Sequence, residues 1–360
     1  MNVYGIIMAG GGGTRFWPLS RQTMPKQLLN LSGNDALINE TINRISSFIN
    51  KEDIFIVTNE KQKEPLKEVV AANCLDKNIL LEPAARNTAA CIGYAAIEII
   101  KKFGDGVMCV FPADHYIKDE IEFKNILQRA ISVVNDTDKL ITIGIRPTFP
   151  STGYGYINFD YESSSNYEGQ AFDVIEFVEK PNYEKAKAYV ESGKYLWNSG
   201  MFVWRAATIL ENFKRFLPKV YNKLEEFSKY LGTDKETAKL KEIYPTIPSI
   251  SIDYGIMERS DDVLVIPGDF GWNDVGSWDA LGALYEPDEN GNIIKGEQIN
   301  IDTENSILFS DKRLIATIGL KDIIVVETDD AVLVCSKNRS QDVKKIVEKL
   351  QEQGKEEYII

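Results

Sequence analysis

The stretch GIIMAGGGGTRFWPLSRQTMPKQLL, residues 5–29, leads from an apolar strand into four glycines and then through Arg15 to Lys26. Where an apolar run such as residues 3–8 stops at consecutive glycines, the backbone amides of Gly10–Gly13 can turn inward as a nest that binds phosphate oxygens. Arg15 offers a planar fork for two phosphate oxygens, and Lys26 is a flexible point charge suited to an oxygen that gains charge during a reaction. The stretch therefore predicts a polyphosphate site at the end of a strand.

Two better-known phosphate-binding loops fit this stretch badly. A Walker loop needs Lys-Ser or Lys-Thr at a fixed spacing after the glycines, and neither follows here. A dinucleotide fingerprint opens a helix directly, whereas Pro18 is poorly placed inside a first helix of that kind. On the glycines alone, a plain glycine-rich turn is the alternative. Arg15, Pro25 and Lys26 together count against that alternative.

The same residues match a known family. The pattern G-G-x-G-T-R-x-x-P-L-S followed by P-K resembles the signature of the sugar-1-phosphate nucleotidyltransferases. The bulky pair Phe16-Trp17 after the arginine is similar to the mannose-1-phosphate guanylyltransferases. The resemblance implies a Rossmann-like, GT-A-like α/β domain and a small left-handed β-helix-like domain at the C-terminal side. Similar members dimerise, so a homodimer is expected.

Composition limits the classes of protein that this chain can belong to. It has 360 residues and a formal net charge of −13, which argues against a nucleic-acid-binding surface. Four scattered cysteines, Cys74, Cys91, Cys109 and Cys335, form no C-x-x-C pair, so a zinc or redox motif is not expected. The start lacks a signal-peptide pattern and no apolar stretch approaches membrane-spanning length, so we expect a cytoplasmic protein without a membrane partner.

Short apolar runs alternate with stretches of helical period in the first 145 residues. The strands are expected at 3–8, 54–58, 79–81, 107–111 and 140–145, and the helices at 36–48, 60–72, 87–103 and 121–134. This order predicts a mainly parallel central sheet covered on both faces. Ligands of such sheets bind beyond the carboxyl ends of the strands, where the Gly10 loop, Glu82 and Asp114 all lie.

Asp114 follows the apolar run VMCVFPA, so its carboxylate should project from a strand tip. That position suits Mg²⁺, which takes one or two carboxylates together with substrate phosphate oxygens. A lone aspartate after a strand more often caps a helix or forms a turn, so a partner is needed. Asp274, in GWNDVGSW, is the best candidate, and the resemblance assigns the metal to these two motifs. His115 is the only histidine, and we expect it to support Asp114.

The segment LEPAARNTAA, residues 81–90, is a candidate for reading a nucleotide base. Glu82 ends a strand, and Asn87 and Thr88 begin a helix, where Asn87 can also act as N-cap. Guanine presents N–H donors that a carboxylate can accept. The pattern E-P-x-x-x-N-T-A is similar to that of the guanylyltransferases. Capping alone would also explain Asn87 and Thr88.

Three motifs in the middle of the chain have the mixture that a phosphorylated sugar needs: TGYGYI (152–157), FVEKP (177–181) and WNSGMF (197–202). They supply a carboxylate and an amide for hydroxyl groups, a lysine for the phosphate, and glycines for close approach. Adjacent Glu179 and Lys180 could otherwise be an ordinary surface pair. The segment SIDYGIME (251–258) also looks like a family motif, but Asp253 and Glu258 receive no role.

Beyond the Trp278 region the pattern changes. Residues 291–335 hold short β-rich runs separated by Asn, Asp and Gly turns, which predicts a small all-β unit without a regular repeat. A final helix puts Val343, Ile346, Val347 and Leu350 on one stripe, so it must dock on another element. We therefore divide the chain into residues 1–286, the catalytic domain, and 287–360, a β-rich domain with a C-terminal helix. Longer relatives add a phosphomannose isomerase domain, which we do not expect here.

The resemblance implies Mg²⁺-dependent transfer of a guanylyl group from GTP to mannose 1-phosphate. Two alternatives stay open: a nucleotidyltransferase that uses dTTP, UTP or CTP with a glucose-type phosphate, and a non-catalytic sensor of nucleotide sugars. The candidate site residues are Arg15 and Lys26 for catalysis; Ala9, Gly10, Gly11, Gly12, Gly13, Thr14, Glu82, Asn87 and Thr88 for the nucleotide; Gly153, Glu179, Lys180, Asn198 and Gly200 for the sugar phosphate; and Asp114 and Asp274 for the metal.

Overall fold

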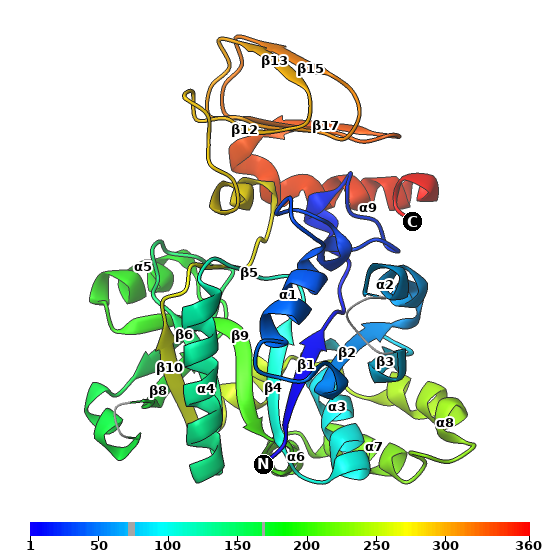
Figure 1. The fold of residues 1–360 in the computed structure, drawn as a ribbon, viewed down its shortest axis with the longest axis vertical. Coiled ribbons are helices and arrows are strands. Elements are labelled where there is room, and N and C mark those ends of the chain that lie inside the picture. Colours follow the sequence, from blue (N-terminus) through cyan, green and yellow to red (C-terminus); the bar gives the residue numbers. More distant parts are fainter. Residues whose placement is uncertain (71–75, 168–169) are drawn as a thin grey trace.

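A nine-stranded sheet forms the centre of the larger domain (Figure 1). The computed structural model describes residues 1–70, 76–167 and 170–360. In the order β3-β2-β1-β4-β9-β6-β10-β8-β7, the strands are β3 (Ile79–Glu82), β2 (Ile54–Asn59), β1 (Val3–Met8), β4 (Val107–Pro112), β9 (Tyr195–Arg205), β6 (Leu140–Ile145), β10 (Val263–Gly268), β8 (Phe172–Val178) and β7 (Tyr156–Phe159).

The two halves of this sheet differ in strand direction. Strands β3, β2, β1 and β4 are all parallel, as the alternation of strands and helices predicts. The long strand β9 then runs antiparallel to both β4 and β6. Beyond it, β6 and β10 are parallel, while β8 and β7 add antiparallel pairs. The predicted α/β fold is confirmed, and its second half is a mixed sheet because β9 is inserted between β4 and β6.

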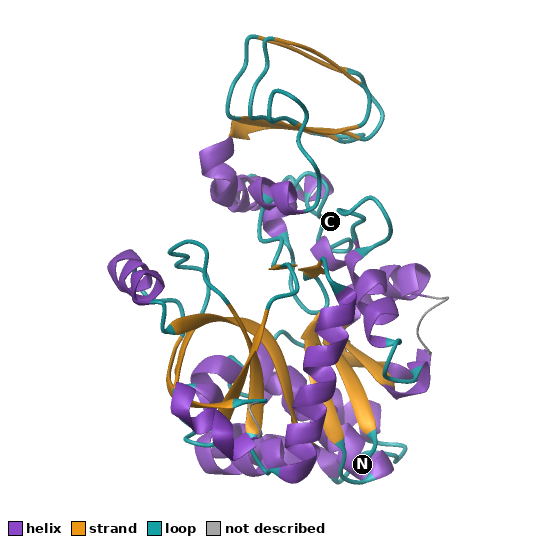
Figure 2. Cartoon of the chain, turned by 60° about the vertical axis from the view of Figure 1, so that its left-hand side comes forward, coloured by secondary structure: helices purple, strands orange, loops and turns teal. Residues whose placement is uncertain are grey.

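Helices cover both faces of the sheet (Figure 2). They are α1 (Leu37–Ile45), α2 (Lys63–Val70), α3 (Asn87–Phe103), α4 (Glu120–Asp136), α5 (Tyr183–Ser192), α6 (Ala206–Phe216), α7 (Pro218–Ser228) and α8 (Glu236–Ile243). One core cluster joins the sheet to α3, α6 and α7, and a second joins it to α1, α2 and α4. The part of the helix predicted at 60–72 that falls on residues 71 and 72 lies outside the described residues, as does Cys74. Cys91 and Cys109 are buried.

The C-terminal β-rich unit is a stack of short parallel strands that ends in one antiparallel strand, β17, paired with β16. Its strands are β12 (Ile293–Lys295), β13 (Gln298–Ile301), β14 (Ile307–Ser310), β15 (Ile315–Ile318), β16 (Ile323–Glu327) and β17 (Val332–Ser336). Ile293 lies opposite Ile307, and Ile307 lies opposite Ile324, so the chain returns to the same position once per coil. The β-rich prediction is confirmed. The repeat is not visible in the sequence because successive coils differ in length.

The C-terminal helix α9 (Lys344–Glu352) joins this unit to the catalytic domain. Val347 on α9 packs in one buried cluster with Phe16 and Trp17 of the signature loop. The Trp17 indole N–H donates to the carbonyl of Tyr358 at 2.9 Å. The predicted stripe is wrong at Ile346, which is 39% exposed, because a nine-residue helix buries only one narrow face here. The helix therefore docks directly on the loop of the predicted polyphosphate site.

The predicted domain boundary falls between the short helical turn η9 (Trp278–Ala283) and β12, and it stays a prediction. Among the described residues, no helix has the length and apolar character needed to cross a bilayer.

Candidate active site

The glycine loop presents its backbone amides outward. Gly11 and Gly13 adopt positive φ angles of 116° and 55°, which L residues with side chains rarely adopt. A Cβ on Gly13 would lie 2.6 Å from the backbone nitrogen of Lys26, so only glycine fits there. Gln62 donates to the carbonyl of Gly11 at 2.9 Å and holds the loop from behind. No amide from Gly10 to Gly13 donates a hydrogen bond to another group in the described chain. Such free amides suit phosphate oxygens.

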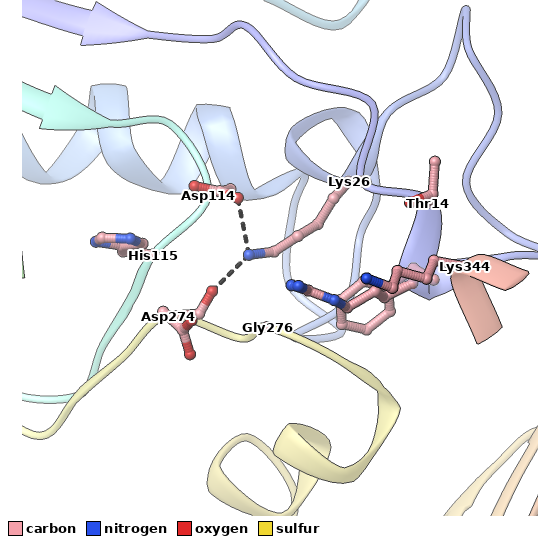
Figure 3. A pocket seen from close by; sticks show the side chains of 10 residues that line it. Thr14, Lys26, Asp114, His115, Asp274, Gly276 and Lys344 are labelled. Atoms are coloured by element: carbon pink, nitrogen blue, oxygen red, sulfur yellow. Dashed lines mark hydrogen bonds and ion pairs between the residues drawn. The ribbon is translucent and has the colours of Figure 1, made fainter. Parts of the chain in front are cut away.

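Beside this loop lies a cavity of about 350 Å³, called here the Lys26 cavity. Lys26 is only 5% exposed. Its Nζ lies 2.8 Å from Oδ2 of Asp114 and donates to the backbone carbonyl of Asp274 at 2.5 Å (Figure 3). The cavity is lined by Gly13, Thr14, Arg15, Phe16, Lys26, Asp114, His115, Asp274, Gly276 and Lys344.

A two-stranded ribbon brings the two aspartates together. Strand β5 (Tyr116–Ile117) follows Asp114, and β11 (Trp272–Asn273) precedes Asp274. These strands pair antiparallel, so both aspartates line the Lys26 cavity although 160 residues separate them in the chain. The next residue, Val275, is fully buried with φ of 46°, an unfavourable conformation for a β-branched residue. Such backbone strain is typical of functional sites.

Electrostatics keep Asp114 ionised and His115 neutral. Burial opposes the charged form of Asp114, but the charge of Lys26 and the hydrogen bond from its ammonium outweigh the cost of burial, so the pKa of this carboxyl is lowered. Burial lowers the pKa of His115 to about 4. The indole N–H of Trp272 donates to Nδ1 of His115 at 3.1 Å, which fixes that nitrogen as an acceptor. The hydrogen bond of His115 is therefore to Trp272, and the expectation that His115 supports Asp114 is not met by a direct bond.

The chemistry of the two aspartates fits a magnesium ion. Both are hard oxygen donors at the cavity wall, and Asp274 uses only Oδ1 to accept from the Tyr154 hydroxyl, at 2.7 Å. No cluster of three or more His, Cys, Asp or Glu side chains in the described chain could hold a metal alone. Mg²⁺ does not need such a cage, because water and substrate phosphates complete its octahedron. The metal assignment to Asp114 and Asp274 stays a prediction.

A second cavity of about 300 Å³, the Glu179 cavity, adjoins the first. The two cavities share Asp114, His115 and Asp274. Of the remaining predicted residues, this cavity is lined by Gly10, Thr88, Gly153, Glu179, Lys180, Asn198 and Gly200. The structure thus brings the three middle motifs and the two aspartates into one continuous crevice.

Asn198 is held in place within the Glu179 cavity. Its Nδ2 donates to Oδ1 of Asp253 at 2.9 Å, and its Oδ1 accepts from Thr142 at 3.0 Å and from the amide of Gly200 at 3.1 Å. Burial and the nearby charge of Glu179 raise the pKa of Asp253 to about 6. The sequence alone assigns no role to Asp253. In the structure its carboxylate accepts a hydrogen bond from Asn198 and so positions that side chain.

Glu179 is a buried carboxylate rather than a surface one. Its side chain is 8% exposed and lies 2.8 Å from Nζ of Lys180. Glu258 accepts the backbone N–H of Glu179 at 2.7 Å. A Cβ on Gly155 would lie 2.5 Å from Oε2 of Glu179, so this glycine permits the close approach. Gly153, the predicted glycine, lines the cavity, but a Cβ there would lie 3.6 Å from Oγ of Ser151, an ordinary contact that does not require glycine.

The base-reading segment lies partly outside the two cavities. Glu82 is 7% exposed, accepts from the Tyr244 hydroxyl, and has its pKa raised to about 7 by burial. The N-cap prediction for Asn87 is wrong, because Asn87 is the first helical residue with φ of 65° and its side chain accepts only from Thr88 N. The hydroxyl of Thr88 accepts from the amide of Ile252 at 2.9 Å.

Some nucleotide-binding predictions line neither cavity. Asn87 is exposed but outside both, and so are Gly11 and Gly12. Ala9 is 1% exposed, and its carbonyl accepts from Gln27 at 2.7 Å, so it supports the loop rather than facing a ligand.

Sequence reasoning missed residues that reach the site from distant segments. Tyr154 bonds Asp274, and Lys344 lines the Lys26 cavity from α9. Tyr154 lies within the TGYGYI motif, so its ring position could have been suspected. The sequence around Lys344 has no phosphate-binding motif, because its position depends on how the C-terminal helix docks.

Comparison with known proteins agrees with this geometry. The family described as "Nucleotidyl transferase" matches residues 4–290, and the "MannoseP isomerase/GMP-like beta-helix domain" matches residues 296–350. The chain is 41% identical to a mannose-1-phosphate guanylyltransferase of Escherichia coli K12 over 99% of this chain and 75% of that protein. A protein of the same name from Salmonella montevideo is 42% identical over 98% of this chain and 75% of that protein.

A solved structure from Thermus thermophilus, titled a mannose-1-phosphate geranyltransferase, matches with a TM-score of 0.87 and 33% identity over 98% of this chain and all of that one. Fold, site geometry and relatives lead to the same conclusion: the chain belongs to the nucleotidyl transferase family and, within it, to the mannose-1-phosphate guanylyltransferases.

Proposed function

We propose that this chain transfers a guanylyl group from GTP to mannose 1-phosphate, which yields GDP-mannose and pyrophosphate. The observation that supports it most is the meeting of two unlike cavities at Asp114 and Asp274. One cavity has cations and free amides for a triphosphate. The other has a buried carboxylate and a fixed amide for sugar hydroxyls. A two-substrate reaction needs this juxtaposition of binding sites.

The reaction itself needs little covalent help from the protein. An ionised phosphate oxygen of mannose 1-phosphate attacks the α-phosphorus of GTP, a new P–O bond forms, and the bond between the α-phosphorus and the bridging oxygen breaks. Pyrophosphate leaves with the electron pair. Lys26, fixed between Asp114 and Asp274, is placed to neutralise charge on the α-phosphate. The amides of Gly10–Gly13 and Arg15 hold the leaving phosphates.

Magnesium is part of this proposal. Asp114 and Asp274 would hold it at the border of the two cavities. When bound there, Mg²⁺ supplies positive charge to the phosphate oxygens of both substrates.

Substrate selection is assigned to two groups of residues. We assign base reading to Glu82 and Thr88: Thr88 lines the Glu179 cavity together with the glycine-loop residue Gly10, and the carboxylate of Glu82 can accept the N–H donors of guanine. A Cβ on Gly10 would lie 3.6 Å from Oε2 of Glu82, so the glycine loop and this carboxylate are close neighbours. We assign Glu179 and Asn198 to the mannose hydroxyls and Lys180 to the sugar phosphate, because all three line the Glu179 cavity.

The test is pyrophosphate release from the purified protein in MgCl₂ buffer. GTP, ATP, UTP, CTP and dTTP are each combined with mannose 1-phosphate, glucose 1-phosphate or no sugar. The proposal expects release with GTP and mannose 1-phosphate and little with other pairs. Pyrophosphate release with dTTP or UTP and glucose 1-phosphate would indicate a different nucleotidyltransferase. The absence of release with every pair would indicate a non-catalytic sensor.

We also infer a homodimer and a location in the cytoplasm, where GTP is made and used. The β-rich unit exposes apolar side chains on neighbouring parallel strands: Ile299 is 57%, Ile301 51% and Ile318 70% exposed. Exposed apolar patches of this kind often mark protein interfaces. Light scattering after gel filtration would report the mass, and a monomer at all concentrations would overturn the dimer.

A further inference from the structure

Lys344 lies apart in sequence from the other residues of the Lys26 cavity. It is the first residue of α9, in the C-terminal domain, and its exposed side chain lines the cavity with Thr14 and Arg15. Figure 3 shows Lys344 reaching from α9 into the side of the cavity where Thr14 and Gly276 lie. A cation from the second domain thus faces the predicted triphosphate.

The charge state of the cavity wall favours an anion. Lys26 already has a partner in Asp114 at 2.8 Å. For Arg15 and Lys344, by contrast, no ion pair or side-chain hydrogen bond forms within residues 1–70, 76–167 and 170–360. Two unpaired cations on one cavity of a chain with net charge −13 repel each other until a ligand carrying several negative charges enters.

Packing of the neighbouring residues fixes the position of Lys344 at the start of α9. Val343, just before the helix, and Val347, one turn into it, are 2% and 5% exposed and belong to one cluster with Phe16 and Trp17. Phe16 directly follows Arg15. The loop that carries the glycines and Arg15 is therefore also the surface on which the helix of Lys344 is docked. The two cations have a common support, which is the preorganisation that an anion site requires.

We infer that Lys344 binds the β- and γ-phosphates of the nucleoside triphosphate together with Arg15 and stays on the pyrophosphate as it leaves. The inference rests on the proposed function for the identity of the ligand. When the bond between the α-phosphorus and the bridging oxygen breaks, the electron pair goes to pyrophosphate. The positive charge of Lys344 neutralises part of the charge that develops on pyrophosphate. The C-terminal domain then contributes directly to nucleotide binding.

The adjacent residue offers a matched control. Lys345 pairs with Asp342 at 2.7 Å and does not line the cavity. The experiment compares wild type, Lys344→Met, Lys344→Arg and Lys345→Met. It measures KM for GTP, KM for mannose 1-phosphate, and binding of inorganic pyrophosphate in MgCl₂ buffer by titration calorimetry. Thermal unfolding of each variant shows whether the fold is kept.

Loss of one charge-assisted contact should raise KM for GTP and weaken pyrophosphate binding by about tenfold in Lys344→Met. KM for mannose 1-phosphate should change by less than about twofold, since a lost contact to the leaving phosphates does not touch the other substrate. Lys344→Arg should keep most of the pyrophosphate affinity, and Lys345→Met should match wild type.

The inference is overturned if Lys344→Met binds pyrophosphate as well as Lys345→Met does, or if KM for both substrates rises equally. The proposed function fails separately, when wild type makes no pyrophosphate from GTP and mannose 1-phosphate. In that case the pyrophosphate titrations still decide whether Lys344 belongs to a polyphosphate site.

Discussion

The Lys26 cavity and the Glu179 cavity share two aspartates but are built on opposite principles. In the first, backbone amides of the glycine loop and two cations, Arg15 and Lys344, have no partner within the described protein. In the second, Glu179 and Asn198 are already engaged, with Lys180 and with Asp253. The first awaits a ligand that brings negative charge. The second offers fixed acceptors and donors to hydroxyl groups, with Lys180 beside them for a phosphate.

The two cavities also differ in which parts of the chain form them. The Lys26 cavity is lined by the loop that follows strand β1, by the aspartates that flank the ribbon of β5 and β11, and by the first residue of α9. The Glu179 cavity takes its distinct residues from the catalytic domain alone. Substitutions that disturb the C-terminal domain should therefore weaken binding of the nucleotide and leave binding of the sugar phosphate unchanged. Substitutions of the shared aspartates should slow the reaction between the two substrates.

The largest effect is expected at the shared border. Asp114→Asn removes one of two carboxylates that would hold the metal and the charge partner of Lys26. We expect kcat to fall by roughly 10²- to 10³-fold, as when one preorganised electrostatic contact is lost. Steady-state pyrophosphate release measures it. Asp269→Asn is the control, because Asp269 is exposed and lines a different cavity. Activity of Asp114→Asn close to that of the control would contradict the metal assignment.

Loosening the docked helix α9 should affect binding at the Lys26 cavity and leave binding at the Glu179 cavity unchanged. Trp17→Ala opens the cluster shared with Val347 and loses the bond to Tyr358. We expect the free energy of unfolding to drop by about 3 to 5 kcal/mol. KM for GTP should rise while KM for mannose 1-phosphate stays constant. Urea titrations and kinetics measure both effects.

Ile346→Ala is the control for Trp17→Ala, since Ile346 lies on the docked helix α9 beside Val347 but is 39% exposed. A rise in KM for mannose 1-phosphate as large as that for GTP would show that the cavities do not respond independently.

A substitution in the Glu179 cavity should affect only the binding of mannose 1-phosphate. Glu179→Gln replaces a buried carboxylate that faces the Glu179 cavity. We expect KM for mannose 1-phosphate to rise about tenfold, because one charge-assisted hydrogen bond is lost, with KM for GTP nearly unchanged. Glu176→Gln, at an exposed position on strand β8, which ends just before Glu179, should behave as wild type. An equal rise in both KM values would refute the division of roles.

The smallest effect concerns stability and pH. Burial raises the pKa of Glu82 from 4.5 to about 7, so the folded protein binds a proton there that the unfolded chain releases. Stability from this group is present below pH 4.5 and is lost as the pH rises toward 7. Relative to wild type, Glu82→Gln should therefore gain stability between pH 5 and about 7.5. Urea unfolding at several pH values measures the difference, and a constant difference would show that Glu82 is not perturbed.

The sequence predicts the parts of the fold that depend on local pattern. Strand β1 and helix α3 begin and end at the predicted residues, because uninterrupted apolar or helical periodicity defines them. The mixed half of the sheet was not predicted, since the antiparallel direction of β9 depends on its long-range pairing with β4 and β6.

The site is predictable where a motif is local and not where tertiary structure builds it. Lys26, Asp114 and Glu179 stand in compact motifs, and the structure places all three in the crevice. The contact between Asp114 and the Asp274 region relies on strands of two residues, too short to show a pattern. Lys344 enters by helix docking, and the cap predicted at Asn87 fails because its backbone takes a positive φ.

The central claim is that the two substrates lie on either side of Asp114 and Asp274 and react directly with each other. The stereochemistry at the α-phosphorus tests it most directly. One diastereomer of guanosine 5′-O-(1-thiotriphosphate) is reacted with mannose 1-phosphate, and the configuration of the product is read by phosphorus NMR. A single in-line displacement predicts inversion. Retention would require two displacements through a nucleotide bound covalently to the protein, and would contradict the account.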